Sequence, residues 1–156
     1  MNMKRRTFLK SSLAVGAVGA TIGIGLLTPR AVLAAWPKSA FEARTVDDAL
    51  TALTGNAQLT GSNKIHINAP DIAENGAMVS VSVTTSIPDV KSISIIAEKN
   101  LSPLVASFNL DEDDEGFVKT RIKMGKTSSV IAVIKAGGKL YSTGKQVKVT
   151  VGGCGG

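Results

Sequence analysis

Residues 118–124 read VKTRIKM, and they give the clearest period of two in the chain. The even positions are apolar or, at 120, threonine, while the odd positions are Lys119, Arg121 and Lys123. Because successive side chains of a strand point to opposite faces, this pattern predicts a strand with one buried face and one basic face. The basic face is either a surface that steers anions or ordinary solvent exposure, and we interpret it as exposure.

The same alternation, interrupted by turn-forming residues, continues from Asn63 to the end of the chain. It predicts seven short strands, at 65–67, 79–84, 93–95, 104–110, 118–124, 130–134 and 147–151. The stretch 130–134 is apolar on both faces and should be central, and Gly137-Gly138 should form a hairpin turn into Leu140 and Tyr141. We therefore predict an all-β fold, an immunoglobulin-like antiparallel β-sandwich.

Two short helices should precede the sandwich. The first follows Pro37 and runs toward Arg44. The second starts after Thr45, whose hydroxyl can cap a turn that Asp48 closes in return. Apolar residues then recur at helical spacing, and Gly55 can end the helix.

Composition limits the class of protein. The chain has 156 residues, 44% of them apolar, with 18 Lys plus Arg against 12 Asp plus Glu, which suits one globular domain. Five of the bases and none of the acids fall in residues 1–34, so the remainder has 13 bases against 12 acids. The charge expected of a nucleic-acid-binding domain is therefore missing.

The first 34 residues have the pattern of a targeting peptide. A basic start with Arg5-Arg6 precedes an uncharged stretch at 11–27 and the sequence AVLA at 31–34. The paired arginines, followed by Thr-Phe-Leu-Lys, resemble the twin-arginine signal of proteins that are exported after folding. We expect export to the periplasm and cleavage after Ala34; a retained membrane anchor is the alternative. The predicted division is a signal peptide at 1–34, a sandwich domain with its helices at 35–151 and an arm at 152–156.

The chain ends in Gly152-Gly153-Cys154-Gly155-Gly156, and Cys154 is its one cysteine. Glycine loses the most conformational entropy on ordering, so this segment should be a flexible arm. At about 3.3 to 3.6 Å per extended residue, the thiol would reach roughly 10 Å beyond the last strand. A single cysteine and a single histidine exclude an intramolecular disulfide and a structural zinc site.

Three uses of Cys154 have to be weighed. A lone cysteine is most often a small buried residue, but no core surrounds this one. An exported, unpaired thiol often forms an intermolecular disulfide, which would make the chain a structural or interaction module. The third use is covalent attachment of substrate. Because no base lies within 152–156 to lower the pKa of the thiol, we expect activation inside partner enzymes, as in a carrier that is not itself an enzyme.

Other candidate sites are weaker. His66 lies on the polar side of a predicted strand and should be a surface residue. Residues 111–116, DEDDEG, resemble a calcium loop, but Ile122 stands where a bidentate acid is required, so we expect a solvated turn. Neither a serine triad nor a phosphate-binding loop is recognisable. We predict no catalytic residue, no cofactor and no metal site.

Several stretches of the chain also match the pattern of a known family. They are the twin-arginine leader, Trp36-Pro37, 41–43, 46–50, 103–110, 120–124, 133–141 and the terminal Gly-Gly-Cys-Gly-Gly. Together they resemble the SoxY family, the sulfur-compound carriers of the periplasmic thiosulfate-oxidising system. The likeness spans essentially the whole mature chain, and the terminal pentapeptide is its most specific element.

This resemblance implies a heterodimer with a partner called SoxZ and a cycle in which sulfur intermediates stay on Cys154. The haem protein SoxXA would join thiosulfate oxidatively to the thiol, the hydrolase SoxB would release the terminal sulfonate as sulfate, and SoxCD would oxidise the remaining sulfane sulfur. Gly152, Gly153, Gly155 and Gly156 would form the arm. A ubiquitin-like carrier that uses a thiocarboxylate at Gly156 is a further alternative, but its activation requires ATP, which an exported protein lacks.

Overall fold

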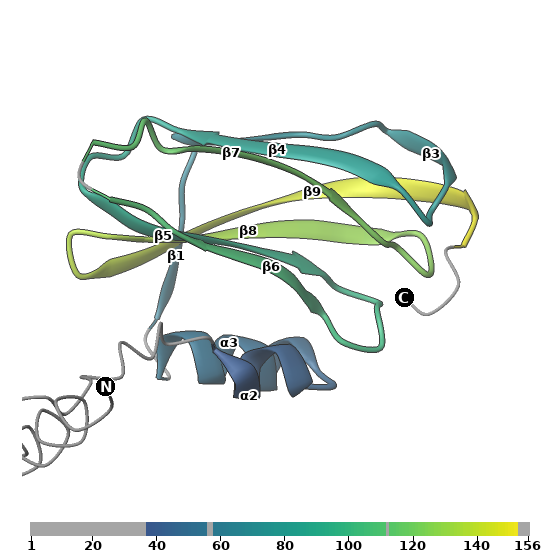
Figure 1. Ribbon diagram of the computed structural model, residues 1–156, viewed down its shortest axis with the longest axis horizontal. Coiled ribbons are helices and arrows are strands. Elements are labelled where there is room, and N and C mark those ends of the chain that lie inside the picture. Colours follow the sequence, from purple (N-terminus) through teal and green to yellow (C-terminus); the bar gives the residue numbers. More distant parts are fainter. Residues whose placement is uncertain (1–36, 56–57, 112, 153–156) are drawn as a thin grey trace, which may run out of the picture. The chain divides into compact units, whose positions relative to one another are not determined.

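The computed structural model describes residues 37–55, 58–111 and 113–152 (Figure 1). The chain divides into two units, Met1–Trp36 and Pro37–Gly156, and every described residue belongs to the second. These residues form the helices α2 (Lys38–Glu42) and α3 (Val46–Thr54). They also form the strands β1 (Leu59–Gly61), β2 (Ile65–Asn68), β3 (Ile72–Asn75), β4 (Val79–Thr85), β5 (Val90–Ala97), β6 (Leu104–Asn109), β7 (Phe117–Ile122), β8 (Ser128–Ala136) and β9 (Lys139–Val151).

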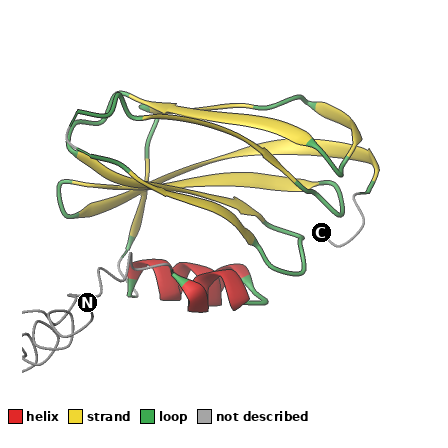
Figure 2. Cartoon of the chain, in the orientation of Figure 1, coloured by secondary structure: helices red, strands yellow, loops and turns green. Residues whose placement is uncertain are grey.

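The strands form two sheets that pack against each other, with both helices on the outer face of the larger sheet (Figure 2). The larger sheet has the order β1-β9-β8-β5-β6, with β3 paired to β9 beside this path, and the smaller sheet has the order β2-β4-β7. Most pairs are antiparallel, while β1 and β3 run parallel to β9 and pair with its first and last parts. The predicted antiparallel sandwich of immunoglobulin-like type is confirmed.

The period of two decides which side chains fill the space between the sheets. Val79, Val81 and Val83 of β4 are buried, and the residues between them face outward. Val118 and Ile122 of β7 are buried in the same way and join the same core. A strand with one solvent-exposed face can carry basic residues on that face, because their charged groups remain in water.

Strand β8 is central and covered on both faces, as the stretch 130–134 predicts. Val130, Ala132 and Ile134 belong to the core between the sheets. Val133, on the opposite face, packs in a second core with residues of α2 and α3. A strand buried on both sides needs apolar residues at consecutive positions, which is why the alternation is lost here.

Helix α3 begins and ends where the sequence predicts, whereas α2 begins after Pro37 as predicted but ends at Glu42, before Arg44. The hydroxyl of Thr45 accepts a hydrogen bond from the Asp48 N–H at 3.1 Å, and this capping bond fixes the start of α3. Gly55 ends the helix in the left-handed region, with φ 62°, and its N–H donates to the Thr51 carbonyl. Ala40 and Ala49 are fully buried, so small side chains let both helices lie close to the sheet.

The strand count of seven is wrong, because the described residues form nine strands. Strands β1 and β3 are short, show little alternation and pair in parallel with distant parts of β9, so no local pattern marks them. The last strand is also longer than 147–151: β9 starts at Lys139 and passes through Gly144, which pairs with Ile131 of β8. Glycine weakens a strand interior, but here the ladder to β8 continues on both sides of it.

Candidate functional site

The last described residues lie where β9 ends, beside the start of β4 and the turn after β7 (Figure 1). Strand β3 holds this end of β9: Asn75 pairs with Val151, and the Gly76 N–H donates to the Val151 carbonyl at 2.7 Å. The Thr150 hydroxyl donates to the Glu74 carbonyl at 2.9 Å. The chain is therefore fixed to the body of the sandwich up to Val151.

Gly152 continues this attachment by one residue. A Cβ atom built at Gly152 would overlap the carbonyl oxygen of Gly125, in the turn between β7 and β8. Only glycine permits such a close approach of two backbones. The sequence assigns Gly152 to the arm, and in the structure its backbone lies against the turn between β7 and β8, so we treat it as the root of the predicted arm.

A buried asparagine holds the turn that Gly152 touches. The Asn100 side chain, 7% exposed, donates from Nδ2 to the Lys123 carbonyl at 2.7 Å and accepts from the Gly125 N–H at 3.0 Å through Oδ1. The Met124 N–H donates to the Gly76 carbonyl at 2.7 Å. We call Gly76, Asn100, Gly125 and Gly152 the root clamp, because their contacts join four separate segments at the point where β9 ends.

The predicted attachment residue, Cys154, lies outside the described residues, as do Gly153, Gly155 and Gly156. Two peptide units separate Cys154 from Gly152, which fixes its Cα within about 7 Å of the root clamp. The root clamp itself was missed from the sequence. A turn between strands is recognisable at Asn100 and at Gly125, but nothing in either sequence says that the two turns bind each other.

The basic face of β7 is present as predicted. Lys119 and Arg121 are exposed and lie beside Ser82 and Ser80 of β4, so small hydroxyl residues flank the bases on this face. Lys123 follows directly after the strand and is exposed as well. Neither Arg121 nor Lys123 forms an ion pair with another described residue.

His66 is exposed on β2 and pairs with Thr84, in agreement with the prediction of a surface residue. Within 37–55, 58–111 and 113–152, no group of three or more histidine, cysteine or acidic residues is placed to hold a metal ion. No helix in these ranges has the length and apolar character needed to cross a membrane.

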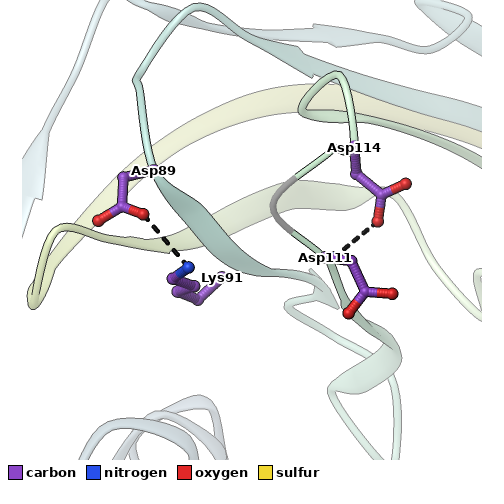
Figure 3. A network of polar contacts seen from close by, with 4 residues as sticks. All are labelled: Asp89, Lys91, Asp111 and Asp114. Carbon is purple, nitrogen blue, oxygen red and sulfur yellow. Dashed lines mark hydrogen bonds and ion pairs between the residues drawn. The ribbon is translucent and has the colours of Figure 1, made fainter.

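The described residues of the acidic stretch, 111 and 113–116, lie in a loop at the other end of the sandwich. Asp114 accepts a hydrogen bond at 2.7 Å from the Asp111 N–H, while nearby Asp89 forms an ion pair with Lys91 at 3.3 Å (Figure 3). These groups line a hollow of about 450 Å³ together with Glu115. The four carboxylates that line this hollow are exposed, which agrees with the predicted solvated turn. They belong to Asp89, Asp111, Asp114 and Glu115.

Comparison with known proteins identifies relatives of both parts of the sequence. Residues 50–154 match the family described as sulfur oxidation protein SoxY, and residues 2–21 match the signal sequence of the twin-arginine translocation pathway. No curated protein matches the chain.

Two solved structures are similar to the chain. The sulfur carrier protein SoxY from Chlorobium limicola f thiosulfatophilum has 46% sequence identity, covers 69% of this chain and 97% of its own, and gives a TM-score of 0.63. A variant form of the superoxide reductase (neelaredoxin) from Ignicoccus hospitalis has 19% identity, covers 67% of this chain and 92% of its own, and gives a TM-score of 0.50. At that identity, the second likeness shows a shared fold alone.

The leader, the sandwich and these matches define an exported sulfur carrier, which the twin-arginine pathway directs to the periplasm. More particularly, the chain belongs to the SoxY family.

Proposed function

We propose that this protein carries the sulfur intermediates of thiosulfate oxidation as covalent adducts on Cys154 and presents them to partner enzymes. The observation that supports the proposal most directly is the place of Cys154 in the sequence. The one cysteine of a SoxY-family chain stands two residues after Gly152, the last described residue, whose backbone lies against the turn at Gly125. The segment beyond the root clamp, Gly153 to Gly156, is then the arm.

The proposed loading step is an oxidation. The Cys154 thiol and thiosulfate join through a new S–S bond, one proton is released, and two electrons pass to the haem partner SoxXA. The adduct then ends in a sulfonate, which SoxB hydrolyses with water so that sulfate leaves and a persulfide stays on Cys154. SoxCD would oxidise that sulfane sulfur further. The chain itself provides no catalytic group in this scheme, and SoxZ is its proposed heterodimer partner.

The glycines of the arm suit repeated docking and release. Ordering each residue costs on the order of 1 to 2 kcal/mol, so an arm that enters an active site does not bind there tightly by its backbone. The tether keeps the adduct at a high effective concentration for each partner without letting it diffuse away. Both effects support a carrier that visits several enzymes in turn.

Intact-mass measurement tests this proposal. Protein isolated from the periplasm of thiosulfate-oxidising cells should contain a fraction heavier by the mass of an S₂O₃ group or of a remaining sulfane sulfur. The Cys154→Ser variant should fold normally and show neither species. An adduct that persists on Cys154→Ser would refute the assignment.

The alternative, an interaction module with an intermolecular disulfide, gives a different result in the same preparation. Its cross-linked species would be visible on a non-reducing gel, and reduction would abolish its function. A carrier should work with its thiol reduced between cycles. The proposed removal of residues 1–34 is read from the same mass spectrum.

A further inference from the structure

A second hollow, of about 360 Å³, lies next to the root clamp, between the turn after β5 and the end of β7. Asn100, Leu101 and Ser102 line one side, and residues 121–123 line the other. Two of the lining residues, Arg121 and Lys123, are cationic, and none is acidic. Because neither base has an ion-pair partner among the described residues, both charges are available to an anion.

The surrounding turns reinforce this charge. The turns at this end of the sandwich, 76–78, 98–103 and 123–127, contain three lysines and one glutamate. The turns at the opposite end, 62–64, 86–89, 110–116 and 137–138, contain six acids and one base, Lys64. An oxyanion near the domain is therefore attracted to the end where β9 stops and repelled from the other.

The hollow and the arm share structural residues. Asn100 lines the hollow and also binds the Gly125 N–H, and the Lys123 carbonyl accepts the other hydrogen bond of the same side chain. Cys154 lies within about 7 Å of Gly152 by covalent geometry. A lysine side chain and a thiosulfonate each add further reach, so a group attached to Cys154 is able to meet the bases of this hollow.

We propose that Arg121 and Lys123 form an anion-binding subsite for the terminal oxyanion of the adduct on Cys154. The identity of the anion, an adduct on Cys154, rests on the proposed function. The charge and position of the subsite come from the described residues and do not depend on that function. Arginine presents planar paired donors and lysine a compact charge, a combination suited to sulfonate oxygens. Hydrolysis that releases sulfate removes the group that the subsite holds. The subsite thus distinguishes an arm that still carries an oxyanion from one that carries a persulfide.

The test uses two adducts of the exported protein that differ in charge. Tetrathionate loads the thiolate without any enzyme: the cysteine sulfur attacks one inner sulfur, the central S–S bond breaks, and thiosulfate leaves with the electron pair. Iodoacetamide gives a neutral adduct for comparison. In NMR spectra, the thiosulfonate should shift the Arg121 side-chain N–H and the amides of 100–102, whereas the neutral adduct should not. Equal spectra at these positions for the two adducts would overturn the proposal.

Matched variants identify the residues responsible. Combining Arg121→Gln with Lys123→Gln should abolish the difference between the two adducts at 100–102. Lys119→Gln, which removes a charge from the same face outside the hollow, should leave the difference intact. If the double variant does not fold, the comparison of the two adducts on the unmodified chain still decides.

A third measurement distinguishes binding of a free anion from binding of the anion attached to Cys154. Free thiosulfate is titrated into Cys154→Ser: shifts at the same signals mean that the subsite also takes the free anion, and shifts confined to the tethered adduct mean that it needs the arm. Absence of shifts in both cases overturns the subsite. Because tetrathionate loads the thiol in vitro, this result is independent of whether the cell uses Cys154 as a carrier, which the intact-mass experiment decides.

Discussion

The two ends of the sandwich differ in how they use their polar groups. At the acidic end, Asp111 and Asp114 bind each other within one exposed turn, and Asp89 pairs with a lysine two residues away. At the end where β9 stops, Asn100 and Gly76 instead join segments that are distant in the sequence. The first set of contacts shapes a loop, and the second fixes the point from which the C-terminal segment leaves.

This difference shows why charge density is a poor guide to the functional end. The acidic turn has the highest concentration of ionisable residues in the chain, yet its described carboxylates, those of Asp111, Asp113, Asp114 and Glu115, are all exposed to solvent. The root clamp contains no charged side chain. What matters there is position, because any group on Cys154 is confined to the space around Gly152.

The largest expected effect is the loss of stability in Asn100→Ala. This change leaves the Gly125 N–H and the Lys123 carbonyl without their partner at a buried position, which costs about 2 to 3 kcal/mol of the free energy of unfolding for two such groups. Urea unfolding of the exported protein measures it.

Asn75→Ala is the matched control at the same end of the molecule. The Asn75 side chain accepts one hydrogen bond, from the Ala77 N–H at 2.9 Å, in an exposed turn. Its loss should cost less than about 1 kcal/mol. Equal destabilisation by the two variants would mean that the Asn100 contacts do not hold the two turns together.

A smaller and more local effect is expected from Gly152→Ala. The new methyl group overlaps the Gly125 carbonyl, so the end of β9 must move away from the turn. The Gly76 N–H, which donates to Val151, should then exchange with solvent about tenfold faster, equivalent to about 1.4 kcal/mol of local opening free energy. Hydrogen exchange followed by NMR measures it.

The control for this variant is Gly153→Ala, which adds the same methyl group one residue further along. If the arm begins at Gly153, exchange of the Gly76 N–H should stay within about twofold of the unmodified protein, since no hydrogen bond to the sandwich is altered. The same acceleration in both variants would place the root of the arm further along the chain than Gly152.

Local signals explain which parts of this molecule the sequence predicts. The cap of α3 depends on Thr45 and Asp48, three residues apart, and the core of β4 on a repeat of two, so both are visible in a short window. The basic face of β7 follows from the same repeat. The signature Gly-Gly-Cys-Gly-Gly points to the carrier site through resemblance, although it says nothing about the surface around it.

The root clamp depends on contacts across the sequence, which no window contains. Asn100 and Gly125 are 25 residues apart, and each has the composition of an ordinary turn. Strand β3 is recognisable only when β9 lies beside it, because its burial pattern has a single buried residue. Gly152 is a further case. A glycine at this position is expected both in a flexible arm and where two backbones approach closely. Only the position of Gly125 in the structure shows the close approach.

The smallest effect should come from the acidic end. Asp114→Ala removes one exposed hydrogen bond to the Asp111 N–H and one negative charge from a crowded turn. The lost bond and the relief of repulsion oppose each other, so the free energy of unfolding should change by less than about 0.5 kcal/mol. Asp114→Asn removes the charge but keeps an oxygen acceptor, so it should be at least as stable as Asp114→Ala, and the gap between the two should be insensitive to salt. A loss from Asp114→Ala as large as that from Asn100→Ala would show that this turn also supports the fold, and would remove the contrast between the two ends.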